Sequence, residues 1–179
     1  IRFIEQSALY YAQVRGLGTL KLNSTKEYVE KYTEEFYLVD LYYRRTLEAY
    51  HELITKENPI EQTLSDAKHQ LDLEYAKITN VLNLEWLTCV GEKGAWFTET
   101  GLKRQEDFYK NESDTSVKQV VIVCDALRYE VAKELMQELA KEKHIATIDA
   151  YQAMLPTETK YCKPALLPHH SLELNGTDM

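Results

Sequence analysis

The first half of the chain alternates apolar and polar residues with the period of an α-helix. Between residues 26 and 54 apolar side chains recur every three or four positions: Val29, Tyr32, Phe36, Val39, Tyr43, Leu47, Tyr50 and Ile54. This spacing places them on one face of a long helix. After a break at "KENP", where Asn58 and Pro59 suit a helix start, a second such pattern runs from about residue 59 to 87. Two long helices joined by a short turn predict an antiparallel hairpin.

The 13 tyrosines of the chain are concentrated in this predicted hairpin. A stripe of tyrosines can bind a ligand or stack on nucleic-acid bases. At helical spacing, however, tyrosines more often pack in a core and keep their hydroxyl groups in water. We therefore favour the packing interpretation.

The pattern changes after "NESDTS", a polar, turn-rich stretch that we take as a domain boundary. "GLKRQEDFYKN", just before it, is compatible with a short helix. The run "VVIVC" (120–124) predicts a buried parallel strand, and "HIATIDAY" (144–151) predicts a second short strand. Between them lies a predicted helix from Leu127 to Lys143, whose inward residues would be Val131, Leu135 and Leu139. We thus expect an α+β protein: a helical region at 1–112, then a β-α-β unit that opens a domain at 117–179.

Composition narrows the function classes. The net charge of −8 does not suggest general attraction to nucleic acid or to an anionic membrane, and no apolar run is long enough for a membrane span. Three widely separated cysteines, Cys89, Cys124 and Cys162, form neither a disulfide framework nor a CxxC metal site. We expect them to be small buried residues in a cytoplasmic protein. Because the chain begins at Ile1 and not at methionine, we also expect a segment of a longer protein.

Asp125 follows the predicted strand 120–124 directly. In an open parallel sheet, ligands bind beyond the carboxyl ends of the strands, where a carboxylate can hold a metal ion. The segment after the second predicted strand should open on the same edge, so Thr157 or Thr159 could lie near Asp125. A carboxylate beside a hydroxyl suits metal-assisted phosphoryl chemistry. Pattern alone favours Asp125 as a helix cap over a metal ligand, and it explains the threonines as turn residues.

Two motifs carry a family resemblance. "VVIVCDALRYEVAKEL" resembles the opening strand and helix of the PglZ domain, and "LPTETKYCKPALLPH" resembles the next motif of that domain. The earlier stretches "FYLVDLYYRRTLEAYHELI" and "GLKRQEDFYKN" are similar to the helical region of PglZ proteins from bacterial BREX phage-defence systems. Cys124 and Cys162 depart from the serine and glycine that are usual in the two motifs, and Pro164 restricts where a helix can begin.

The resemblance implies the α/β/α sandwich of the alkaline phosphatase superfamily, with a site for two divalent metals, usually zinc. It implies that Asp125 binds metal, and that Thr159 touches the metal and is the nucleophile, phosphorylated transiently. The other ligands of the family lie downstream of both motifs. His169 and His170 receive no ligand role. We therefore expect these 179 residues alone to hold no metal pair and to be inactive.

The resemblance also implies a partner set: other proteins of the defence system, and a phosphoester substrate that can be a nucleic acid, a nucleotide or a phosphoprotein. No membrane partner is expected. The alternative function is a scaffold without catalysis, in which the tyrosine-rich helical hairpin would dock other proteins of the complex.

Overall fold

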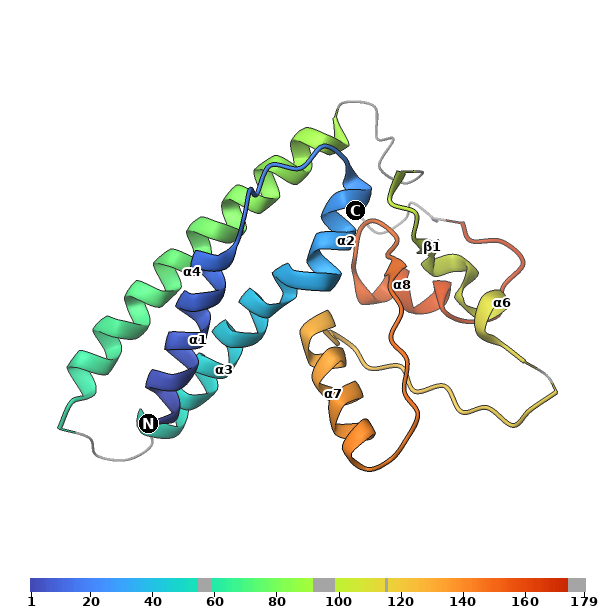
Figure 1. Ribbon diagram of the computed structural model, residues 1–179. Coiled ribbons are helices and arrows are strands. Elements are labelled where there is room, and N and C mark those ends of the chain that lie inside the picture. The colour runs from blue at the N-terminus through green and yellow to red at the C-terminus, as the bar shows by residue number, and fades with distance from the viewer. Residues whose placement is uncertain (55–58, 92–98, 115, 174–179) are drawn as a thin grey trace.

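Two long antiparallel helical rods dominate the first half of the structure, a computed structural model that describes residues 1–54, 59–91, 99–114 and 116–173. The first rod consists of α2 (Thr25–Lys31), the π-helical turn η1 (Tyr32–Phe36) and α3 (Tyr37–Ile54), joined without a break. The second is α4 (Glu61–Val90), which runs antiparallel to the first (Figure 1). The two rods lie where the periodicity predicts helices. Asn58, the predicted cap, lies outside the described residues.

A further helix, α1 (Arg2–Gly16), was not predicted from the sequence. It packs along α3 (Figure 1), where Phe3 and Tyr10 enter two clusters of buried side chains. The first cluster joins Phe3 to Ala49 and Leu64, and the second joins Tyr10 to Val39 and Leu71. The signal for α1 was present in the spacing of Phe3, Tyr10 and Val14, but the polar Ser7 interrupts it.

The tyrosines of the two rods pack against one another, so the packing interpretation is confirmed. The rings of Tyr43 and Tyr75 stack with their centroids 3.8 Å apart. Their hydroxyl groups donate hydrogen bonds to the carboxylates of Asp72 and Asp40, at 3.0 and 2.7 Å. Burial, together with the hydrogen bond to Asp72, raises the pKa of Tyr43 to about 12.

Short elements make up the second half. They are β1 (Lys103–Arg104), η2 (Gln105–Asp107), α6 (Phe108–Glu112), α7 (Tyr129–Lys141), β2 (Tyr151–Gln152) and α8 (Thr159–Ala165). β1 and β2 form a two-stranded parallel sheet, with Lys103 opposite Tyr151 and Arg104 opposite Gln152. The buried Thr100 hydroxyl fastens the sheet by donating to the Gln152 side chain at 2.8 Å. A mainly helical chain with this small sheet is consistent with the predicted α+β class.

The predicted β-α-β unit is not formed. Residues 120–124 are not a strand, and their side chains are exposed: Val120 and Ile122 are each 80% accessible to solvent. Of the predicted strand 144–151, only Tyr151 belongs to a strand, and it pairs with β1. A strand is stable only where neighbouring strands accept and donate its backbone hydrogen bonds. Within the described residues, segment 120–124 has no such neighbour.

The orientation predicted for α7 is also wrong. Leu135 and Leu139, expected to face inward, are 50% and 36% exposed, whereas Glu130 is fully buried. α7 therefore packs against α3 through its charged face and leaves apolar residues in solvent. The helix was predicted over Leu127 to Lys143 and extends over Tyr129–Lys141.

The structure bears on two expectations from composition, the burial of the cysteines and the lack of a membrane span. Cys124 is exposed, so the expectation that all three cysteines are buried is wrong for this residue, while Cys89 and Cys162 are partly buried and all three are free thiols. The exposure of Cys124 follows from that of the neighbouring segment 120–123. In the part of the chain that the structure describes, no helix has both the length and the apolar character needed to cross a membrane.

Candidate functional site

Asp125 lies at the end of the extended segment 120–124, where the chain turns toward α7. One oxygen of its carboxylate accepts a hydrogen bond from the backbone N–H of Ala126 at 3.0 Å. Ala126 has a φ of 55°, in the left-handed region that residues with a Cβ rarely adopt. The N-cap position of α7 is occupied by Arg128 and not by Asp125. The interpretation of Asp125 as a helix cap is therefore wrong.

Thr159 meets Asp125 across the gap between α7 and α8. Its hydroxyl group lies 3.1 Å from Oδ2 and 3.3 Å from Oδ1 of Asp125, so it can donate to either carboxylate oxygen. Thr159 is the first residue of α8, and both side chains are exposed. The structure thus brings together two of the residues singled out from sequence. Of the two threonines considered, Thr159 is the one that makes this hydrogen bond in the described ranges.

The loop before α8 sets the position of Thr159. Glu158 occupies the N-cap position, and its backbone carbonyl accepts hydrogen bonds from the N–H groups of Tyr161 and Cys162, at 3.0 and 2.9 Å. The Glu158 carboxylate lies 3.6 Å from the ammonium group of Lys160. This cation partly offsets the negative charge that Glu158 would present to a phosphoester beside Thr159.

The Asp125–Thr159 pair offers two oxygen donors of the kind that divalent cations accept. The pair therefore fits one side of a metal site. Within the described residues, no group of three or more histidine, cysteine, aspartate or glutamate side chains lies close enough to complete one. His169 and His170 are exposed, and Nδ1 of His169 donates to the carbonyl of Leu167 at 2.7 Å. A complete metal centre would need donors beyond the described ranges.

A charged cluster around the buried Glu130 begins three residues after Asp125 in the sequence, and it was not predicted. Glu130, the second residue of α7, is fully buried, and one of its oxygens lies 3.2 Å from Nε of Arg128 and 3.7 Å from Nε of Arg44. Asp40 of α3 accepts hydrogen bonds from the hydroxyl groups of Tyr32 and Tyr75, at 2.6 and 2.7 Å. It also pairs with Arg128 at 3.5 Å.

The contacts of the cluster raise the pKa of Arg128 and of Tyr32. A hydrogen bond with Tyr75, followed by the charges of Glu130 and Asp40, raises the pKa of Arg128. Burial and the hydrogen bond to Asp40 raise the pKa of Tyr32. Arg128 is therefore a permanent cation, and Tyr32 is a permanent donor to Asp40. The only hint in the sequence was the charge of "RYE" at a helix start.

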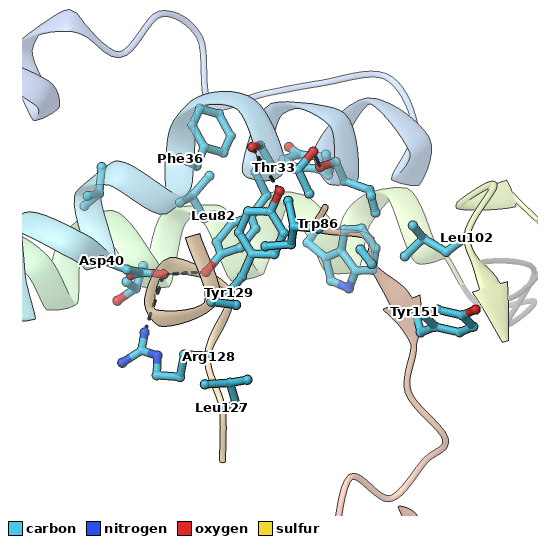
Figure 2. Close-up of a pocket in the computed structure, with 18 of the residues that line it drawn as sticks. Thr33, Phe36, Asp40, Leu82, Trp86, Leu102, Leu127, Arg128, Tyr129 and Tyr151 are labelled. Carbon is cyan, nitrogen blue, oxygen red and sulfur yellow. Dashed lines mark hydrogen bonds and ion pairs between the residues drawn. The ribbon is translucent and has the colours of Figure 1, made fainter. Parts of the chain in front are cut away.

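A cavity of about 890 Å³ lies beside the cluster, between the helical rods and the segments around 127–132 and 148–151. Figure 2 shows Asp40 and Arg128 at one end and the aromatic rings of Trp86 and Tyr129 along it. Leu127, two residues after Asp125, also lines it. Sequence periodicity cannot reveal such a space, because it arises between elements that are distant along the chain.

Comparisons with known proteins agree with the two motifs. The family described as "BREX system PglZ alkaline phosphatase-like domain" matches residues 106–178. The chain is similar to the alkaline phosphatase-like protein PglZ of Bacillus cereus (strain H3081.97), with 30% identity over 96% of this chain and 21% of that protein. It is also similar to the alkaline phosphatase-like protein BrxZ of Escherichia coli O9:H4 (strain HS), with 38% identity over 40% of this chain and 9% of that protein.

The chain thus spans about a fifth of the length of the Bacillus relative. No solved structure matches it. The family match includes both Asp125 and Thr159, and the Bacillus match extends the relationship to the helical region. The resemblance of the two motifs is confirmed: residues 106–178 match the PglZ domain of BREX systems, and the two similar proteins carry the names PglZ and BrxZ.

Proposed function

We propose that this chain is part of a longer, metal-dependent phosphoester hydrolase that acts in BREX phage defence in the bacterial cytoplasm. The observation that carries the proposal is the hydrogen bond between Thr159 and Asp125, which joins the two residues to which the family resemblance gives the nucleophile and a metal ligand. The substrate class is a phosphoester, with nucleic acid, nucleotide and phosphoprotein as candidates. Other defence-system proteins are the proposed partners.

The proposed reaction uses Thr159 as nucleophile. The proton of the Thr159 hydroxyl passes to water as Oγ forms a bond to phosphorus, while the bond from phosphorus to the leaving oxygen breaks and the leaving oxygen takes a proton from water. Water then cleaves the bond between Oγ and phosphorus and returns a proton to Oγ, which releases phosphate from a monoester substrate or a phosphomonoester from a diester. Asp125 accepts the hydrogen bond of the hydroxyl group and so orients Oγ. A divalent cation, in this family usually zinc as one of a pair, would be held by Asp125 and Thr159 and would lower the pKa of the hydroxyl group.

The proposal includes the α/β/α sandwich fold that the family resemblance implies. Segment 120–123 and the apolar face of α7, which includes Leu135 and Leu139, are exposed here. We propose that the rest of an α/β/α sandwich covers both surfaces in the longer protein, where 120–124 would pair as a strand. The same downstream sequence would supply the missing metal ligands. The 179 residues alone are then inactive, since two donors cannot hold a metal pair.

Hydrolysis by the longer protein tests this function. With zinc present, Asp125→Asn and Thr159→Ala should each lower kcat/KM on a nitrophenyl phosphodiester by about a thousandfold or more, as expected for the loss of a ligand or nucleophile. Asp114→Asn is the matched control, because Asp114 is also exposed and, among the described residues, its carboxylate accepts hydrogen bonds from Ser116. Full activity of Thr159→Ala would exclude Thr159 as the nucleophile.

A second candidate, a scaffold without catalysis, is favoured by one observation. Leu73, Leu84 and Leu87 of α4 are each more than half exposed and lie on one face of the helix. In this case Leu84→Glu with Leu87→Glu should abolish phage defence, while Asp125→Asn should leave it intact. The hydrolase proposal requires the opposite result for Asp125.

A further inference from the structure

Helix α7 is fixed to the helical region by charged and aromatic contacts. Glu134 pairs with both Arg44 and Arg45 of α3, with Nη2 of Arg45 at 2.6 Å. Arg44 also lies against Glu130, which is fully buried between it and Arg128. Glu130 is the fully buried charge of this group, and among the described residues neither of its carboxylate oxygens has a hydrogen-bond partner, so the two arginines alone balance its charge and moving them away would be strongly unfavourable. The arrangement therefore holds α7 in one position on α3.

Tyr129 adds a second, uncharged anchor at the start of α7. Its hydroxyl group donates to the backbone carbonyl of Thr33 at 3.3 Å. Its ring meets the ring of Tyr37 edge-on, with the centroids 5.6 Å apart, and packs near Tyr32. Figure 2 shows Tyr129 and Arg128 directed toward the helical rod that carries Thr33 and Asp40. Arg128 and Tyr129 thus contact this rod at several points along its length, from Thr33 to Asp40.

Asp125 is separated from this anchor by only Ala126 and Leu127. Ala126 adopts the left-handed conformation, which persists at a residue with a Cβ only when its surroundings impose it. On one side the chain is the exposed segment 120–124, which has no strand partner among the described residues. Among the described residues, the turn is therefore held from the α7 side, and the strand pairing proposed above for the longer protein would add a second support at residue 124.

We propose that the helical region positions the metal-binding loop, with Arg44 on α3 and Arg128, Tyr129 and Glu130 at the start of α7 as positioning residues for Asp125. Within the "DALRYE" motif, Asp125 then serves the site, while Arg128, Tyr129 and Glu130 dock the loop on the helices. None of the three is assigned contact with substrate or metal. The inference rests on the proposed function for the identity of the site, but the docking itself does not depend on hydrolysis.

Arg44 gives the sharpest test, because it lies on α3, 81 positions before Asp125 in the sequence. In the longer protein, Arg44→Met removes the charge and keeps an unbranched side chain, and Arg44→Lys restores a charge. Lys26→Met is the matched control, since Lys26 pairs with Glu30 within α2 and neither residue is on α7. Three quantities are measured: amide exchange of residues 125–141, affinity for Zn²⁺ alone, and kcat and KM on a nitrophenyl phosphodiester.

We expect Arg44→Met to speed exchange in residues 125–141 and to weaken Zn²⁺ binding by about ten- to a hundredfold, the effect of removing a partner that orients a ligand. The value of kcat should fall with KM nearly unchanged, Arg44→Lys should recover part of each loss, and Lys26→Met should change none. Protected exchange in α1 and α4 distinguishes loosening of α7 from global unfolding.

Unchanged exchange in Arg44→Met, or faster exchange with unchanged Zn²⁺ affinity, would overturn the positioning role. A failure of the proposed function gives a different result. The unmodified longer protein would then bind no Zn²⁺, and the exchange measurement would still decide whether the helical region fixes the loop.

Discussion

The helical region buries apolar side chains that the segment from residue 117 to 145 leaves exposed to solvent. Leu71 and Val39 of the helical region are 1% and 2% exposed, whereas Ile122 and Ile145 of the segment are 80% and 100% exposed. A helix satisfies its backbone within one stretch of sequence and needs only one packed face. A strand needs neighbours from elsewhere in the chain. The comparison indicates that the helical region carries its own core, whereas the apolar residues of 120–123 and Ile145 are left uncovered among the described residues.

The largest effect should come from the core of the helical region. Leu71→Ala leaves a cavity beside Tyr10 and Val39 and should lower the free energy of unfolding by about 2–5 kcal/mol. Ile122→Ala should cost less than about 0.5 kcal/mol in the 179-residue chain, because the side chain is exposed. Urea unfolding of both variants measures the contrast. Equal losses would mean that segment 120–123 is buried in solution.

A smaller loss is expected where the two regions meet. Asp40→Asn keeps the shape of the side chain but weakens its hydrogen bonds from Tyr32 and Tyr75 and its pairing with Arg128. The buried hydroxyl groups lose a charged acceptor, so we expect the free energy of unfolding to fall by about 1–3 kcal/mol. Asp66→Asn, at an exposed position of α4, is the control and should be nearly neutral. If Asp40→Asn were equally neutral, the interface would not depend on this carboxylate.

High pH should destabilise the helical region selectively. The pKa of Tyr43 is raised from 10.0 to about 12 in the folded chain, so the unfolded chain loses this proton first. The stabilisation is therefore fully present below pH 10 and is lost as the pH rises toward about 12. Tyr43→Phe should flatten this decline in urea unfolding followed between those pH values. An unchanged slope would show that Tyr43 is not buried against Asp72 as described.

The smallest effect is a gain in stability at the end of α7. Lys143 has a φ of 63°, and the N–H groups of Lys143 and His144 donate to the carbonyls of Ala140 and Leu139, a helix end that usually carries glycine at the Lys143 position. Lys143→Gly should therefore raise the free energy of unfolding by about 0.5–1 kcal/mol. A loss of stability would show that α7 ends differently. Lys141→Gly, inside the helix, should be destabilising.

Sequence reasoning succeeded where the determining interactions are local. The spacing of Val39, Tyr43 and Tyr50 was enough to predict the long helix, because one face of a helix repeats along the sequence. The strand predicted at 120–124 is not formed, because pairing and burial of a strand depend on neighbouring strands that cannot be identified from the sequence of the segment itself. The orientation of α7 was misjudged for a related reason: Arg44 and Arg45 draw its charged face toward α3.

The candidate site shows the same division. Asp125 and Thr159 were identified through their motifs, and the structure brings them within hydrogen-bond distance. The roles of ligand and nucleophile remain predictions. The cluster around Glu130 was not predicted, because its members come from η1, α3, α4 and the start of α7, and no single motif contains them all. The domain boundary at 113–116 also remains a prediction.

The most direct test of the central claim is to trap the phosphorylated nucleophile. The longer protein is mixed with zinc and a phosphoester, quenched in acid, and the peptide containing Thr159 is analysed by mass spectrometry. The account predicts a phosphate on Thr159 that appears during turnover and is absent in Thr159→Ala and Asp125→Asn. Steady turnover by the unmodified protein with no phosphate on Thr159, and undiminished turnover by Thr159→Ala, would contradict it.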